Sequence, residues 1–414
     1  MDKKYVAARG SLGAFGAGTQ AVRAGNIVFV GGLMSLDNEG HIVGSDIGTQ
    51  ARNVFDALSQ VLADAGASMT DVVKHNVYFH NDRDDADAGK FMEELNRVRV
   101  EYFSDPGPTT TEVEVGLDRD GALILVDAWA VIGVDKQLLA PEGHWGWSSP
   151  LPFSQGWKVG DFIFVGGQRS LDATGKLLGA GDIEVQTAKT FGNLEIMLRE
   201  GGGDRNNLMR QNTYFRFQGQ GRAVTDYWER MNKVRRQYMS IPSAAGAGLR
   251  IPGFPAVHGA SSADELIQVE GIAVLGDDKQ RLMPADHWDW SIADSQFTQG
   301  WRIGDLVFVG GQISADEHAK AVGEGMEAQA RNVFQFIRNT LHEASLDEND
   351  VVKLYVYYHA EGDWEHIAEA VDSINSVRRE FYEDPGPAVT AVRVSGFAFE
   401  DLLIEVEALA VVRG

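Results

Sequence analysis

The sequence contains no cysteine at any of its 414 positions. Disulfides, thiolate metal ligands and a cysteine nucleophile are therefore excluded together. Positive charge is scarce as well, because 37 lysines and arginines stand against 60 aspartates and glutamates, for a formal net charge of −23. Such a field repels a phosphate backbone, and no lysine- or arginine-rich run offers a local exception, so we expect no nucleic-acid partner.

Long apolar runs are lacking too. The sequence has no stretch of about 18 apolar residues, so we expect no transmembrane helix and no membrane partner. The first residues, Met1 to Tyr5, lead into a stretch rich in glycine and alanine rather than the apolar segment of a signal peptide. We therefore expect a cytoplasmic protein.

What the sequence does contain is one apolar segment, bounded by glycines, that occurs three times. Its copies are residues 25–33, 160–168 and 304–312, and each contains a glycine pair near its end. This pattern predicts a short buried strand. The distance between copies fits a whole small domain rather than a solenoid unit. We therefore expect three tandem domains, at residues 1–137, 138–280 and 281–414.

The segments after the glycine pair predict the same order of elements in each repeat. In the first repeat, Ala51, Val54, Phe55 and Leu58 recur with helical spacing and predict one buried helix face. A strand rich in β-branched and aromatic residues follows at residues 72–80, 208–215 and 351–359. A second helix then stops before a proline turn, and two strands close the unit. Helices packed on one face of a sheet give each domain the α+β class.

Two further segments match each other and are rich in tryptophan. They run from His144 to Trp157 and from His287 to Trp301. Flexible linkers are not usually built from tryptophan. We therefore expect both segments to pack along the contacts between repeats.

The combined pattern resembles the RidA/YjgF family: a strand ending in Gly-Gly-Gln, a Gln-Ala-Arg helix, an asparagine-bearing second helix, a proline turn and a final Val-Glu-Ala-x-Ala-Val strand. Members of this family are homotrimers of chorismate-mutase-like subunits, with ligand clefts between neighbouring subunits. The resemblance covers nearly the whole chain, three times over. It implies three tandem RidA-type domains in a single-chain pseudo-trimer with three unequal clefts, and a further homo-oligomer stays open.

The resemblance also places functional residues. The family's acid in the last strand, which positions or activates water, falls on Asp127, Glu270 and Glu407. A carboxylate in such an apolar strand is costly unless it is paired or faces a wet cleft. The alternative to catalysis is a structural ion pair with an arginine of the second helix, namely Arg99, Arg235 or Arg378.

Other positions are implied to bind substrate. The family's cleft tyrosine falls on Phe153 and Phe297, and on Gly18 in the first repeat. Its hydroxyl before the Gly-Gln falls on Gly31, Gly166 and Gly310, and its second-helix asparagine on Asn96, Asn232 and Asn375. The alternative for the phenylalanines is packing, and for the asparagines a brace within a turn.

One family position departs from the pattern. The arginine that clamps the substrate carboxylate falls on Thr110 and Val389, and near Gly246 in the second repeat, and none of these residues is basic. Arg250 and Arg393 lie four residues further along the same strand, hence on the same face. A guanidinium there would grip a carboxylate bidentately, so both are predicted to bind substrate; the alternative is a salt bridge between repeats.

We predict a hydrolase of C–N bonds that converts an enamine or imine to a carbonyl compound and ammonia without a cofactor. Its partner is a small, carboxylate-bearing substrate, and relatives in the family suggest 2-aminomuconate from aromatic degradation. The competing interpretation is a non-catalytic binding or regulatory protein. Ribonuclease activity, claimed for some relatives, is disfavoured by the negative charge. We expect no metal site, because His144 and His287 lack a second ligand at metal spacing.

Overall fold

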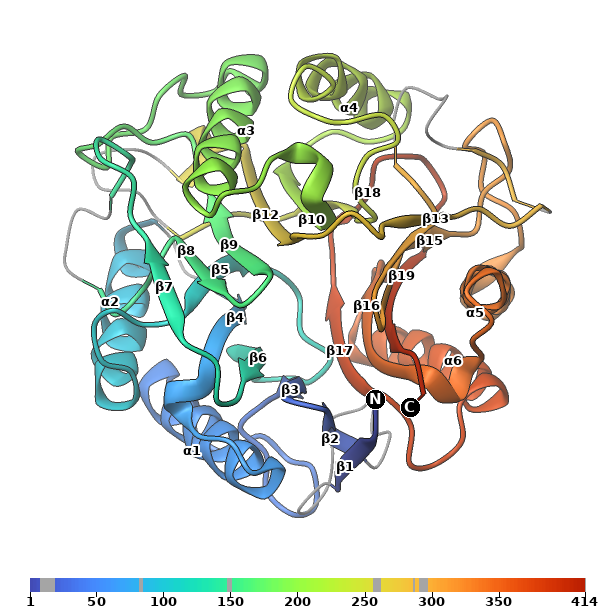
Figure 1. The fold of residues 1–414 in the computed structure, drawn as a ribbon, viewed down its shortest axis with the longest axis horizontal. Helices are drawn as coiled ribbons and strands as arrows, with labels where there is room; N and C mark the ends of the chain where they lie inside the picture. Colours follow the sequence, from blue (N-terminus) through green and yellow to red (C-terminus); the bar gives the residue numbers. More distant parts are fainter. Residues whose placement is uncertain are drawn as a thin grey trace.

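The computed structural model describes residues 1–7, 19–81, 85–146, 151–255, 262–285, 287–289 and 297–413. Three units of similar topology surround a common axis, with their sheets toward the axis and their helices outside (Figure 1). The two ends of the chain lie side by side, and the ammonium group of Met1 donates to the carbonyl oxygen of Val412. The third unit thus closes the ring against the first. The predicted α+β class, with three tandem units in a single-chain pseudo-trimer, is confirmed.

Each unit is built on one sheet. The first sheet consists of β1 (Lys3–Ala7), β2 (Thr19–Ala24), β3 (Ile27–Leu33), β4 (Val72–Phe79), β5 (Thr109–Glu114) and β6 (Ile124–Val131). The second consists of β7 (Lys136–Leu139), β8 (Gly156–Val159), β9 (Phe162–Gln168), β10 (Leu208–Arg216), β11 (Gly248–Ile251), β12 (Ile267–Val274) and β18 (Gly396–Phe397). The third consists of β13 (Gln280–Leu282), β14 (Gly300–Ile303), β15 (Leu306–Ile313), β16 (Val351–Tyr358), β17 (Ala388–Arg393) and β19 (Ile404–Val411).

The strand order places the glycine-bounded strand next to the last strand of its repeat. In the first sheet the order is β1-β2-β3-β6-β4-β5, and the others repeat its central part. β4 runs parallel to β5, as β10 does to β11 and β16 to β17. Parallel neighbours require a long crossover, which the second helix of each repeat supplies. β18 comes from the third repeat but extends the second sheet by pairing with β11.

The helices form the outer layer. They are α1 (Ile47–Ala65), α2 (Asp85–Tyr102), α3 (Ile183–Glu200), α4 (Arg222–Arg235), α5 (Gly325–Glu343) and α6 (Trp364–Phe381). Short 3₁₀ turns occur at η1 (Met69–Asp71), η2 (Arg205–Asn207), η3 (Ser262–Asp264) and η4 (Glu348–Asp350). α1 begins where Asp46 accepts a hydrogen bond from the backbone N–H of Thr49, and it ends at Gly66, whose φ of 79° stops the helix. Within the described part of the chain, no helix is long and apolar enough to cross a bilayer.

Hydrophobic packing joins the units at the axis. One core cluster draws on the inner faces of all three sheets and includes Trp129, Phe164 and Phe308. The rings of Trp129 and Phe164 meet edge to face with centroids 5.8 Å apart. Three further clusters lie between each sheet and its own helices. Because the central cluster is shared, we expect the units to depend on each other for stability.

The glycine pairs let neighbouring repeats approach closely. We call the contact between two repeats a seam, and number the seams 1–2, 2–3 and 3–1. At the 2–3 seam the backbone N–H of Gly311 donates to the carbonyl oxygen of Gly246, 3.0 Å away. A Cβ atom on Gly310 would lie 2.8 Å from the carbonyl oxygen of Thr298 and 3.1 Å from the backbone nitrogen of Gly246. A side chain there has no room, since its neighbours are backbone atoms.

We expect Gly310→Ala to destabilise the protein by about 1–3 kcal/mol, because the methyl group overpacks the 2–3 seam. Gly89→Ala is the control: a Cβ atom on this α2 residue would meet nothing within 4 Å. Alanine in a helix is more stable than glycine by about 0.5–1 kcal/mol, so this variant should be neutral or stabilised. Urea unfolding followed by fluorescence measures both. Equal midpoints for Gly310→Ala and the parent chain would contradict the packing argument.

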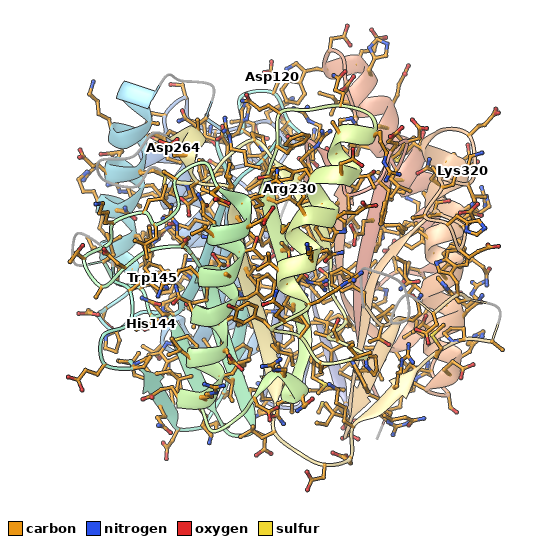
Figure 2. The ribbon with its side chains drawn as sticks, turned by 90° about the horizontal axis from the view of Figure 1, so that it is seen from above. Asp120, His144, Trp145, Arg230, Asp264 and Lys320 are labelled. Atoms are coloured by element: carbon orange, nitrogen blue, oxygen red, sulfur yellow. The ribbon has the colours of Figure 1, made fainter. Side chains whose placement is uncertain are left out.

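The tryptophan-rich segments pack at the seams. The indole N–H of Trp157 donates to the carbonyl oxygen of Gly107 at 2.8 Å, and that of Trp301 to the carbonyl oxygen of Ser243 at 2.9 Å. Both acceptors belong to the preceding repeat. Trp145 is buried, and its indole N–H donates to Gln168 (2.9 Å), within the second repeat. Figure 2 shows Trp145 beside His144, whose ring also contacts Gln168.

Candidate active site

The three acids predicted to be catalytic lie among three buried cations near the centre of the ring. Asp127, Glu270 and Glu407 stand on the last strands β6, β12 and β19, and all are buried. The cations are Lys74, Arg210 and Lys353, each the third residue of its middle strand. Every acid pairs with a cation from a different repeat. The oxygen–nitrogen distances are 2.6 Å for Glu270–Lys74, 2.7 Å for Glu407–Arg210 and 3.9 Å for Asp127–Lys353.

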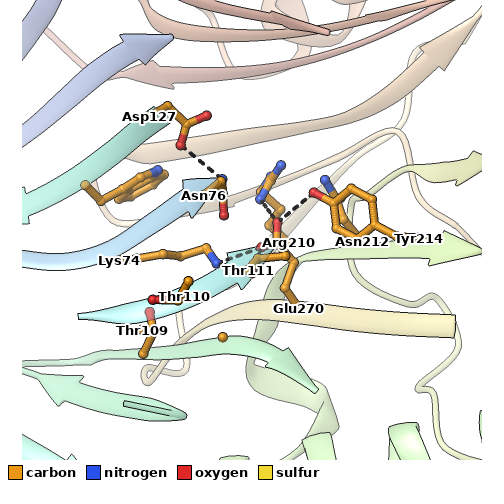
Figure 3. A network of polar contacts seen from close by, with 12 residues as sticks. Lys74, Asn76, Thr109, Thr110, Thr111, Asp127, Arg210, Asn212, Tyr214 and Glu270 are labelled. Carbon is orange, nitrogen blue, oxygen red and sulfur yellow. Dashed lines mark hydrogen bonds and ion pairs between the residues drawn. The ribbon is translucent and has the colours of Figure 1, made fainter. Parts of the chain in front are cut away.

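Glu270 is held by charges from two sides. Lys74, Thr111 and Arg210 converge on its carboxylate (Figure 3), with donor distances of 2.6, 2.5 and 2.9 Å. Burial alone would raise the pKa of Glu270, but the charges of Lys74 and Arg210 outweigh it and lower the pKa to about 2. This carboxylate therefore stays ionised and fully bonded.

Arg210 connects two of the acids. Besides Glu270, it donates two hydrogen bonds to Glu407, at 2.7 and 3.1 Å. Asn212 and Tyr357 complete the surroundings of Glu407, at 2.8 and 3.1 Å. A guanidinium that bridges two carboxylates through several hydrogen bonds fixes the register of the second repeat against the third.

Asp127 is the most weakly paired of the three. Asn76 donates to one of its oxygens at 3.0 Å (Figure 3), and the ammonium group of Lys353 is 3.9 Å from the other. Burial raises the pKa of Asp127, and the charge of Lys353 opposes this rise. Burial likewise lowers the pKa of Lys353 to about 8.

The second-helix arginines make other contacts. Arg99 is ion-paired with Glu112, Arg235 lies over the ring of Phe297, and Arg378 donates to Asn375. The three acids are thus ion-paired, as the structural alternative expected, but their partners are cations of the middle strands and not the arginines of the second helix. Whether any of these acids takes part in catalysis stays a prediction.

A pocket opens at the 2–3 seam, and Glu405 lines it. Its walls are formed by the rings of Trp228, Phe297, Phe397 and Phe399 and by the glycines Gly246, Gly248 and Gly311. Glu405 precedes Glu407 by two residues on β19, so the two side chains lie on the same face of the sheet. Burial and the neighbouring Glu407 raise the pKa of Glu405 well above its usual value, against a hydrogen bond from the backbone N–H of Gly248. A raised pKa makes a carboxyl group better suited to donate a proton.

The other two seams lack a carboxyl group at this place. The glycine that faces Glu405 is Gly311, and a Cβ atom there would run into the carboxyl group. In the second repeat the same contact joins Gly167 to Gln268, and in the first it joins Gly32 to Leu125. The three seams are therefore chemically unequal at equivalent positions.

An outer groove continues from this pocket. The two share Trp228 and Phe399 in their walls. The inner pocket offers about 40 Å³ to water-sized molecules and the groove about 450 Å³. Figure 2 shows α4, marked by Arg230, and the loop that carries Lys320 toward the same end of the molecule. The inner pocket admits a few atoms, and the groove has room for the rest of a small molecule.

Among the other predicted substrate-binding residues, Phe297 lines this pocket and Asn232 lines the outer groove. Phe153 occupies the equivalent place at the 1–2 seam, under the guanidinium of Arg99 at 4.2 Å. Gly18 lies outside the described residues.

The two predicted arginines are not among the residues that line the pocket. Arg250 donates to the carbonyl oxygens of Gly219 and Ser395, and Arg393 to that of Ala360. Arg393 lines a different groove, with His80 and His359.

The predicted glycines and asparagines contact other protein groups: the glycines lie against backbone atoms, and the asparagines bond to arginine side chains. A Cβ atom on Gly166 would lie 2.7 Å from the carbonyl oxygen of Thr110, so Gly166 serves close approach at the 1–2 seam as Gly310 does at the 2–3 seam. Each of the asparagines Asn96, Asn232 and Asn375 accepts a hydrogen bond from the arginine three residues later.

Sequence reasoning missed Glu405. The signal was present, because the third repeat has two acids at alternating positions, Glu405 and Glu407, where the other repeats have one. Alternation alone places both on one face, so only the packing of the seam tells which of them meets the pocket.

Comparison with known proteins then decides the family. The sequence model of the endoribonuclease L-PSP family matches residues 10–132, 148–246 and 291–412. The chain belongs to this family, the RidA/YjgF family. Single-domain relatives match one repeat each. A RutC family protein of Pyrococcus abyssi is 34% identical over 131 residues, 31% of this chain and 98% of the relative.

Two further relatives of this RidA/YjgF family member are named after an enzymatic activity. The 3-aminoacrylate deaminase RutC of Acinetobacter baylyi is 32% identical over 125 residues, 30% of this chain and 94% of the relative. A 2-iminobutanoate/2-iminopropanoate deaminase of Salmonella typhimurium is 30% identical over 120 residues, 28% of this chain and 88% of the relative.

One solved structure matches most of the three-repeat chain. A chorismatase is similar with a TM-score of 0.52 and 14% identity, over 82% of this chain and 92% of its own. This likeness concerns the fold alone.

Proposed function

We propose that this chain is a cofactor-independent deaminase that hydrolyses an imine, or the imine tautomer of an enamine, to a carbonyl compound and ammonia. The observation that carries the proposal is the buried carboxyl group of Glu405, which lines an aromatic pocket at the 2–3 seam and whose pKa is raised by burial. Relatives at about 30% identity that are named as imine and aminoacrylate deaminases support the reaction class.

The chemistry needs one group that gives and takes a proton. Glu405 protonates the imine nitrogen, which makes the carbon electrophilic, and its carboxylate then accepts a proton from the attacking water. A C–O bond forms and gives a carbinolamine. Glu405 next protonates the amine nitrogen, the C–N bond breaks, and the hydroxyl proton returns to the carboxylate as ammonia leaves. Atoms and charge balance without a cofactor.

The substrate expected from the sequence, 2-aminomuconate, belongs in the first test. It carries two carboxylates, whereas no lysine or arginine is found among the described residues that line the inner pocket. We therefore treat 2-aminomuconate as one member of a panel, with 2-iminopropanoate and 3-aminoacrylate.

A non-catalytic binding protein is the second candidate. It is favoured by the 1–2 and 3–1 seams, where Gln268 and Leu125 replace the carboxyl group. Ammonia release separates the two: we expect the purified chain to accelerate release from at least one imine of a broad panel above the spontaneous rate. Binding of the same compounds, seen by calorimetry without acceleration, would favour the binding protein.

A further inference from the structure

Among the described residues that line the inner pocket at the 2–3 seam, none carries a positive charge. Of the described residues that line this pocket, Glu405 is the one with an ionisable side chain. A substrate carboxylate at the reacting carbon would therefore lie beside an acid that becomes anionic in each catalytic cycle, and none of the described residues that line the pocket is a lysine or arginine that could offset this charge.

At two positions of the second repeat that line the pocket, the backbone leaves no room for a cationic side chain. A Cβ atom on Gly246 would collide with the carbonyl oxygen of Gln211, and one on Gly248 would lie 2.5 Å from the ring of Trp228. The guanidinium of Arg235 lies 4.1 Å from the ring centre of Phe297, one of the rings that line the pocket. The wall that remains is aromatic and suits an apolar group.

The outer groove adds negative charge. Its acids are Glu229, Glu317, Glu400 and Asp401, and its cations are Arg222 and Lys320. Arg222 is already paired with Asp226 at 2.7 Å and with Glu229 at 3.3 Å. An anionic substrate is thus opposed in the groove as well as in the pocket, whereas a neutral or cationic one is not.

We propose that the 2–3 seam takes imines that carry no carboxylate, with an apolar or aromatic group next to the C=N carbon. This inference rests on the proposed function and names its substrate class. The C=N group enters the inner pocket beside Glu405, and the aromatic group lies against Trp228 and Phe399 where pocket and groove meet. Hydrolysis yields an aldehyde or ketone and ammonia.

A matched pair of imines tests the proposal. A flavin amine oxidase makes phenylacetaldimine from phenethylamine, and an amino-acid oxidase makes 2-imino-3-phenylpropanoate from phenylalanine. The two differ by the carboxylate alone, and semicarbazide traps whichever imine survives. The full chain should reduce semicarbazone formation from the imine that it hydrolyses. We expect its kcat/KM for phenylacetaldimine to be at least tenfold higher than its kcat/KM for 2-imino-3-phenylpropanoate. Preference for the carboxylate compound, or equal rates, would overturn the inference and leave the deaminase intact; no turnover of any imine would overturn both.

A charged variant tests the cause. Phe399→Arg places a cation where the pocket meets the groove, and Phe399→Met is the uncharged control of similar length. We expect Phe399→Arg to shift the ratio of the two kcat/KM values toward the carboxylate compound at least tenfold relative to Phe399→Met. An unchanged ratio with both variants folded, as judged by circular dichroism, would mean that charge does not set the selectivity.

Discussion

Replacing Glu405 by glutamine is expected to lower kcat/KM for imine hydrolysis at least about a hundredfold, the usual contribution of a positioned acid or base. Glutamine keeps the shape and one hydrogen-bond donor but has no proton to transfer. The fold should accept it, because Gln268 occupies the equivalent place in the second repeat, against Gly167. Initial rates of ammonia release measure the loss.

The pH dependence gives a second readout. Activity needs Glu405 protonated, so it should fall as the pH rises through the raised pKa of this group. Stability should follow the same sign: a buried acid with a raised pKa binds its proton more tightly when folded, so the wild-type chain loses stability as the pH rises above the ordinary carboxyl pKa. Glu405→Gln should lack that loss and be the more stable of the two at high pH.

The control for Glu405→Gln is Gln268→Ala, whose seam has no carboxyl group and whose turnover should stay near wild type. Substitutions of the three central acids test whether catalysis belongs to them instead of Glu405. If Glu407→Gln, Glu270→Gln or Asp127→Asn abolished turnover in a folded chain while Glu405→Gln did not, catalysis would belong to the central acids.

The fold followed from the sequence because its strongest signals are local and repeated. The glycine-bounded strand, the helix face of Ala51 to Leu58 and the proline turns each predict one element, and three copies support each other. The packing of Trp157 and Trp301 against the preceding repeat also followed, since their exposure in a linker would be costly. The domain boundaries stay a prediction.

The site was harder to predict because it depends on contacts between repeats. Lys74, Arg210 and Lys353 stand in buried strands, and nothing in one repeat shows that the acid of another lies opposite. Arg250 and Arg393 share the face of the expected clamp, but both donate to backbone carbonyl oxygens, and neither lines the pocket. Such distances come from packing rather than from spacing in the chain.

Replacing Arg210 by methionine is expected to be among the most destabilising single changes in the chain, by about 3–5 kcal/mol. Arg210 donates to both Glu407 and Glu270, and all three side chains are buried. Methionine fills much of the volume but leaves Glu407 as a buried charge with only neutral partners. Urea unfolding of the whole chain measures the change.

Two comparisons separate charge from packing. Arg210→Lys should be intermediate, since lysine occupies the equivalent position in the other two repeats, as Lys74 and Lys353, but reaches fewer oxygens. The double variant Arg210→Met with Glu407→Gln should recover part of the loss, because it removes the orphaned charge along with its partner.

The pH at which acid unfolds the protein should also change in the Arg210→Met variant. The folded-state pKa of Glu270, about 2, lies below its unfolded value, so its pairing stabilises the protein above the ordinary carboxyl pKa and is lost as the pH falls toward 2. Without Arg210 one of the two cations that lower this pKa is gone, so Arg210→Met should unfold at a higher pH than the wild type. A variant that matched the wild type in both urea and acid would show that the shared apolar core, rather than the ion pairs between repeats, holds the ring together.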